Sequence, residues 1–345
     1  MAAIRPRDLL TDSLLGRLGG TWAGTDAAGG DVAATLSRDI AKLGDAGYLN
    51  VTLPPEFGGL GCTLRQAACG QRRLARHAPR TALAVSAHLY WTGAAADAYR
   101  AGDNSVRWIL LEAARGALFA AGHGTTGGDL ATAGRDLRFA DPRSRCEPTG
   151  ESGYRFRDTA VLSSQTPTWD WAAVHAVHAS DAVLAFAGRG SRCTPALRVA
   201  RVRHSGAPGD VFTASAVGWG HSILASVQYS DARRAFNAAV AAVAADAATV
   251  ADGVAWAADA ATPALRAKHP LDRWEVAEAG LRLDAMKARI AEITHPWPRV
   301  PAPAPDLGGQ RLIGIFTMRH EVADGARHVL NLTAQIADAP AVAAL

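Results

Sequence analysis

GYLNVTLPPEFGGLG (residues 47–61) is the stretch that does most to decide the fold. Pro54 and Pro55 force an extended turn, and the glycines after them allow backbone conformations that other residues avoid. Two further segments follow in order: AAGHGTTGGDLAT (residues 120–132), a glycine-rich loop with an aspartate, and YRFRDTAVLSSQTPTWDW (residues 154–171), a strand with paired serines. Such a loop gathers backbone N–H groups, and bare glycines let a ligand approach them closely. The order predicts a helical part closed by a turn, then β structure carrying a binding loop.

The apolar pattern divides the chain into three domains. Residues 1–117 have helical spacing, with expected helix stops at Gly44, Gly47, Gly102 and Gly116. Residues 118–230 hold short β-rich runs, VHAVHA, VLAFAG and LRVARV, between clusters of turn residues. Residues 231–345 predict bundle helices over 231–261, 271–293 and 312–336, with a proline-rich connector before the last. The fold class is therefore mainly α with a small central β domain.

Composition excludes several classes of function. Hydrophobic residues make up 49% and charged residues 20% of 345 residues, which is ordinary for a folded enzyme. The net charge of +4 comes with no dense basic run, so we expect no nucleic-acid partner. Cysteine spacing predicts neither a metal site nor a disulfide framework, and no apolar stretch is long enough for a membrane span. We expect a cytoplasmic protein without a membrane partner.

The three segments resemble the acyl-CoA dehydrogenase family over nearly the whole chain. The family's Thr-Glu-x-x-Ala-Gly-Ser-Asp motif, aligned on Asp129, places Gly122 on its threonine, His123 on its glutamate, Gly127 on its glycine and Gly128 on its serine. The family's Trp-Ile-Thr, followed by a second Trp, falls on Leu162, Ser163, Ser164 and Trp171. The resemblance implies a three-domain architecture: an N-terminal helical domain, a β-barrel-like middle domain and a C-terminal helical bundle.

In this family a flavin lies between the last two domains, so the resemblance implies FAD, or FMN or reduced flavin in a monooxygenase. The residues expected to bind it are Ala121, Gly122, His123, Gly127, Gly128, Leu162, Ser163, Ser164 and Arg266. Ser164 keeps the hydroxyl that faces the reactive flavin nitrogen in the family. Two alternatives stay open: the loop GHGTTGGD cradles flavin, or its glycines serve only a tight turn.

Catalytic residues are harder to assign. The dehydrogenase reaction needs a carboxylate base, which the family places on the first bundle helix or late in the chain. The predicted helix 231–261 has no glutamate, and the sequence ends at Leu345, before the late position. The remaining candidates are His88, which the resemblance places near a substrate pocket, His123 in the loop, and Asp246 on the helix. Each has a structural alternative: helix packing, a loop contact to backbone, or a solvated aspartate.

Three functions are compatible with these observations. The first is an acyl-CoA dehydrogenase-like enzyme that oxidises CH–CH groups of an acyl thioester or related small molecule. The second is a two-component flavin monooxygenase of the same fold, which takes reduced flavin from a separate reductase. The third is a non-catalytic subunit that assembles with a related, active chain. The family and the alanine-rich first bundle helix predict an oligomer, either a homodimer or homotetramer or a hetero-oligomer.

Overall fold

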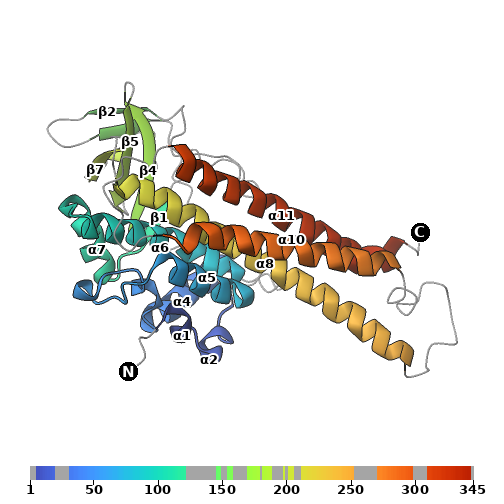
Figure 1. Cartoon of the computed structure of the whole chain (residues 1–345). Helices are drawn as coiled ribbons and strands as arrows, with labels where there is room; N and C mark the ends of the chain where they lie inside the picture. The colour runs from blue at the N-terminus through green and yellow to red at the C-terminus, as the bar shows by residue number, and fades with distance from the viewer. Residues whose placement is uncertain are drawn as a thin grey trace.

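The structure is a computed structural model that describes residues 5–19, 31–121, 145–148, 154–157, 169–178, 181–188, 197–198, 201–205, 211–251, 270–297 and 309–342. Within them, N-terminal helices, a small sheet and a long helical bundle are arranged as Figure 1 shows. This confirms the predicted fold class. No helix in the described ranges has the length and apolarity required to cross a membrane.

The N-terminal part is helical, as predicted. Its elements are α1 (Pro6–Leu9), α2 (Asp12–Leu15), α4 (Val32–Asp45), η1 (Tyr48–Asn50), η2 (Pro55–Phe57), α5 (Leu64–His77), α6 (Pro79–Arg100), η3 (Asn104–Val106) and α7 (Arg107–Ala114). Gly47, Gly102 and Gly116 follow helix ends with φ of 74°, 95° and 94°, which confirms them as stops. The prediction for Gly44 is wrong, because it lies inside the last turn of α4.

The stretch over residues 47–61 forms the predicted turn. Its two arms are joined by the Gly61 N–H, which donates to the Leu53 carbonyl at 2.8 Å. Gly59 allows this close approach, since a Cβ there would lie 2.1 Å from the Leu53 oxygen. Gly58 adopts a φ of 80° after the two prolines. The turn then delivers the chain into α5, whose start is fixed by a capping box between Thr63 and Gln66.

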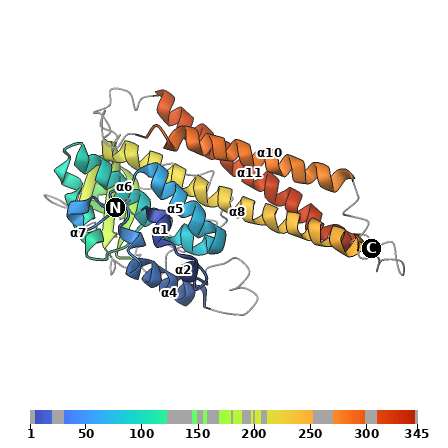
Figure 2. The same ribbon diagram turned by 60° about the horizontal axis from the view of Figure 1, so that its bottom comes forward.

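Helix α6 is the centre of the first hydrophobic core. Nearly all of its residues are buried, so it lacks a solvent face and packs on several sides. Trp91, Phe119 and Phe212 are among the largest fully buried side chains of this core. The rotated view shows α5 and α6 lying along the N-terminal half of the bundle helix α8 (Figure 2). The N-terminal domain and the bundle therefore share one core.

The small sheet lies at one end of the molecule (Figure 1). Its strands are β1 (Phe119–Ala121), β2 (Arg145–Pro148), β3 (Tyr154–Arg157), β4 (Trp171–His178), β5 (Asp181–Gly188), β6 (Leu197–Arg198) and β7 (Arg201–Ser205). The order is β6-β3-β2-β4-β5-β7, and β1 pairs with β4. The antiparallel hairpin of β4 and β5 runs from Trp171↔Gly188 to His178↔Asp181. The β runs predicted from VHAVHA and VLAFAG are confirmed, and the run LRVARV is divided between β6 and β7.

Among the residues that the structure describes, the bundle consists of α8 (Val211–Ala251), α10 (Pro270–Thr294) and α11 (Gly309–Val342). They lie side by side and extend beyond the N-terminal domain (Figures 1 and 2). The predicted second and third helices are confirmed. The predicted start of the first at Asp231 is wrong, because α8 begins at Val211, inside the stretch assigned to the middle domain. Burial of Phe212 and Trp219 against α6 outweighs the weak helical propensity of this segment. The domain limits at 117 and 230 stay predictions.

Candidate functional site

The strand pair β1 and β4 connects the two segments expected to bind flavin. β1 is parallel to β4, with Phe119 opposite Trp171 and Ala121 opposite Ala173. The residue before the glycine-rich loop therefore lies beside the strand that follows the paired serines. Most of the predicted flavin residues lie outside the described part of the chain, namely Gly122, His123, Gly127, Gly128, Leu162, Ser163, Ser164 and Arg266. What is described is the strand frame from which the loop departs.

His88 fixes the start of this frame. Its Nε2 lies 3.0 Å from the Leu49 carbonyl, and its Nδ1 accepts from the Phe119 N–H at 3.4 Å. This pair of contacts requires the tautomer with the proton on Nε2. Burial lowers the pKa of His88 to about 4, so the ring is neutral near pH 7. Both ring nitrogens are used by backbone groups, which gives His88 a positioning role toward β1; its predicted catalytic role stays a prediction.

A second contact holds the entry to β1 from the other side. The Asp170 carboxylate accepts from the Leu118 N–H at 2.9 Å, directly before β4. The backbone on either side of the strand pair is therefore anchored by one histidine and one aspartate. Such anchoring keeps the departure point of the glycine-rich loop at a fixed position relative to α6.

The aromatic residues beside this frame pack against one another. The ring centroids of Trp91 and Phe186 are 5.2 Å apart, and those of Trp91 and Phe212 are 5.9 Å apart. Trp108 and Trp171 extend the cluster, with centroids 5.2 Å apart. Edge and stacked contacts at these distances are typical of a filled interior. These contacts agree with the packing alternative for the helix that carries His88, and its catalytic role stays a prediction.

The α8–α11 seam is the polar feature of the bundle interior. We use this name for His221 and Gln228 on α8 together with Phe316 and Arg319 on α11. His221 and Arg319 are only 2% and 3% exposed, and the His221 ring meets Phe316 edge-on at 4.9 Å. The Nη1 of Arg319 donates to the Gln228 side-chain carbonyl. The seam places one cation and two neutral polar groups between two helices.

Burial dominates the electrostatics of the seam. Burial, together with the neighbouring positive charge of Arg319, lowers the pKa of His221 to about 3. It also lowers the pKa of Arg319 to about 10, which leaves the guanidinium charged at pH 7. His221 is thus a neutral imidazole beside a fixed positive charge. His221 and Gln228 were not predicted as site residues, because they precede Asp231 in a stretch where β structure was expected. On a helix, their spacing of seven residues puts them on one face.

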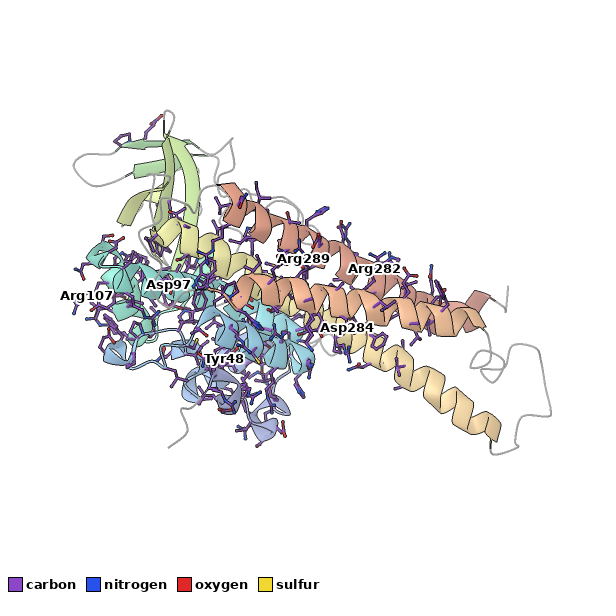
Figure 3. All side chains as sticks on the ribbon, viewed as in Figure 1. Tyr48, Asp97, Arg107, Arg282, Asp284 and Arg289 are labelled. Atoms are coloured by element: carbon purple, nitrogen blue, oxygen red, sulfur yellow. The ribbon has the colours of Figure 1, made fainter. Side chains whose placement is uncertain are left out.

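A separate hub on the other side of α8 joins three elements. Asp97 of α6 is 2% exposed, and its Oδ2 accepts from the indole N–H groups of Trp219 at 2.7 Å and Trp297 at 3.0 Å. Arg100 donates to its Oδ1 at 3.4 Å. Burial raises the pKa of Asp97 to about 6, although the indole bonds, Arg100 and Ser215 oppose the shift. Figure 3 shows Asp97 where α6 meets the bundle.

Two glycines make the hub possible. A Cβ on Gly93 would lie 2.4 Å from the Trp219 ring, and a Cβ on Gly218 would lie 2.0 Å from the Trp297 ring. Both indoles therefore lie directly on helix backbone. We assign the Asp97 hub to the structure of the junction, since each carboxylate oxygen already has a donor.

Other candidates lie apart from this region. Asp246 lies in α8, but its side chain is outside the described residues, and α8 has no glutamate. On α11, Glu321 binds Arg289 and His328 binds Glu278 at 2.7 Å, so these groups are paired with charged residues of α10. No group of three metal-ligating side chains occurs among the residues that the structure describes.

Comparison with known proteins bears on the fold. Residues 23–107 match the family model of the acyl-CoA dehydrogenase N-terminal domain. No curated protein matches the chain by sequence. Among solved structures, the nitrososynthase of Micromonospora carbonacea var. africana is similar with a TM-score of 0.63 at 18% identity, over 96% of this chain and 86% of that one.

Two further structures have comparable similarity. The electron transferring flavoprotein of Acidaminococcus fermentans gives a TM-score of 0.66 at 14% identity, over 96% of this chain and 86% of that one. FMN-bound TdsC, a dibenzothiophene monooxygenase of Paenibacillus sp. A11-2, gives 0.59 at 18% identity, over 88% of this chain and 80% of that one. At these identities the likeness shows a shared fold over most of each chain.

Proposed function

We propose that the chain, whose residues 23–107 match the acyl-CoA dehydrogenase N-terminal domain, is a flavin-dependent oxidoreductase, and that its reaction is the oxygenation of a small molecule with reduced flavin. The flavin supplies the redox chemistry when bound. The choice of reaction depends on one observation: the α8–α11 seam contains a buried neutral histidine, a side-chain amide and a buried cation.

The frame of the expected flavin site fits such a cofactor. β1 and β4 pair in parallel, so the chain leaves Ala121 for the glycine-rich loop beside the strand that follows Ser163 and Ser164. Backbone N–H groups of Gly122 and Gly127 and the hydroxyl of Ser164 would hold the ring, and Arg266 would meet a phosphate. Arg319 adds a buried Nε–H that has no acceptor among the described residues, as expected beside a ligand rich in acceptors.

The alternative reaction, dehydrogenation of an acyl thioester, needs a carboxylate that removes a proton from carbon. α8 supplies no glutamate for this purpose. Asp231, the first aspartate of α8, is bonded by Arg234 at 3.0 Å. Oxygenation makes no such demand on the protein, which has to bind substrate, exclude water and orient both partners. The neutral His221 and Gln228 side chains and the cation of Arg319 would suit those tasks.

The test is an anaerobic titration of the purified protein with FAD and FMN, each oxidised and then reduced, followed by absorption and fluorescence. We expect reduced flavin to bind more tightly than oxidised flavin, and Ser164→Ala to weaken the binding. Tight oxidised FAD that is bleached by an acyl-CoA panel would instead identify a dehydrogenase. Failure of every flavin form to bind would overturn the proposal and favour the non-catalytic subunit.

We further propose that the bundle forms the contact of a homodimer or homotetramer. Trp274 and Leu281 are 69% and 72% exposed, and their spacing of seven residues puts them on one face of α10. A large aromatic and an aliphatic side chain exposed in this way are typical of a covered face. Light scattering of the purified chain measures the assembly; a monomer that unites only with a related chain would support a hetero-oligomer.

A further inference from the structure

Arg319 is the described charge that the fold satisfies least. It is 3% exposed, and its Nη1 bonds only to the neutral Gln228 side chain. Its Nε is buried and has no hydrogen-bond partner in the described part of the chain. A guanidinium carries five donors and a full charge, and burying it without a carboxylate costs several kcal/mol.

The acids nearest to Arg319 along α11 are already engaged. Glu321 is paired with Arg289 of α10. Asp324 is paired with His320 at 3.0 Å and with Arg327. Both acids lie on the exposed side of α11, with side chains 46% and 45% exposed. Within the described ranges, therefore, Arg319 has no counter-ion.

We propose that Arg319, with Gln228 beside it, forms a buried subsite in the α8–α11 seam for an oxyanion, the phosphate or carboxylate of a bound small molecule. The planar guanidinium of an arginine can donate two parallel hydrogen bonds to the two oxygens of such a group. Charge-assisted hydrogen bonds of this kind are stronger than those between neutral groups. The neighbouring His221 ring is neutral and meets Phe316, which is 43% exposed, so a single anion would dominate the local charge.

The oxyanion has two possible sources, the phosphate of FMN and an acid group of the substrate. Both use the same chemistry at Arg319. Comparison of FMN with riboflavin separates them, because riboflavin has the same ring without the phosphate. This comparison depends on the proposed flavin binding, whereas the response to inorganic phosphate does not, so the two proposals can fail separately.

The first experiment measures the thermal midpoint of the full chain with increasing sodium phosphate, against sodium chloride of equal ionic strength. We expect phosphate at 100 times its Kd to raise the Tm of the wild type by about 4 °C. Arg319→Met should lose this shift, and Arg319→Lys should retain part of it. Arg282→Met is the matched control, because Arg282 is 57% exposed on α10 (Figure 3) and should leave the shift unchanged.

The same variants distinguish a ligand site from a structural arginine. If Arg319 awaits an anion, the Arg319→Met protein without phosphate should have a Tm equal to or above that of the wild type. A lower Tm, or dissociation of the oligomer, would show that Arg319 has a counter-ion within the protein and would overturn the proposal. Equal phosphate shifts in the wild type and in Arg319→Met would overturn it as well.

Titration with FMN and riboflavin then identifies the source. A preference for FMN that disappears in Arg319→Met supports the proposal with the flavin phosphate as the anion. Equal binding of both flavins, with the phosphate shift retained, supports it with a substrate acid. If the wild type bound neither flavin but its Tm still rose with phosphate, only the proposed function would be refuted.

Discussion

The substitution Asp97→Asn should change how the unfolding free energy of the protein depends on pH. Burial raises the pKa of Asp97 from 3.8 to about 6. A carboxyl group with a higher pKa in the folded state binds more protons when folded, so its contribution to the unfolding free energy falls as pH rises from about 4 to about 6. The two pKa values differ by an amount worth about 3 kcal/mol. The neutral Asp97→Asn side chain lacks this dependence.

The wild-type profile alone cannot reveal the effect, because buried histidines act with the opposite sign. The pKa values of His88 and His221 are lowered to about 4 and about 3. Both groups bind more protons when unfolded, so their contributions to stability rise with pH up to about 6.5. The quantity to follow is the difference between Asp97→Asn and the wild type, from which the histidine contributions cancel.

Equilibrium urea unfolding between pH 4 and pH 7.5 gives this difference, with reversibility checked at each pH. Relative to the wild type, Asp97→Asn should gain about 3 kcal/mol between pH 4 and pH 7. Asp45→Asn, at an exposed position, controls for the change in net charge. A difference that does not vary with pH would show that Asp97 is not a buried ionisable hub, and a difference of the opposite sign would refute the reasoning entirely.

The remaining predictions concern packing and the anchor of β1. Gly218→Ala should lower the unfolding free energy by about 1 to 3 kcal/mol, because its methyl group would overlap the Trp297 ring. Gly220→Ala should raise the unfolding free energy by about 0.5 to 1 kcal/mol, because its Cβ would lie 3.7 Å from the nearest ring atom of Tyr90. Urea unfolding measures both effects. Equal effects of the two substitutions would contradict the packing argument. His88→Gln, compared with the wild type by the same method, should lose stability increasingly as pH rises from about 4 to about 6.5, by about 3 kcal/mol in total. A constant loss would mean that His88 is not buried as a neutral ring.

Local chemistry made the N-terminal part and the sheet predictable. The turn over residues 47–61 depends on glycines at positive φ and on two prolines, and these preferences act over a few residues. The strands β4 and β5 are runs of apolar and β-branched residues between turn clusters, so their pattern shows directly in the sequence. In both cases the residues that determine the structure lie within a few positions of it in the sequence.

The start of α8 could not be predicted in this way. Its first residues include Val211, Phe212, Trp219 and two glycines, all with weak helical propensity. The helix forms there because Trp219 packs onto Gly93, more than a hundred residues earlier in the chain. Arg319 was missed for a related reason: an arginine on a helix is ordinarily solvated, and only the packing of α8 on α11 buries it.

The two buried charges beside α8 illustrate how structure and function can be separated. Trp219 and Gln228 are nine residues apart, two and a half helical turns, so Asp97 and Arg319 are bound to opposite sides of the same helix. Asp97 accepts bonds from three side chains, and its burial is explained by the contacts it makes. Arg319 is equally buried but has one neutral partner in the described chain. A cation buried without a counter-ion is destabilising, and the proposed oxyanion would offset that cost. The absence of phosphate binding at Arg319 would remove this explanation.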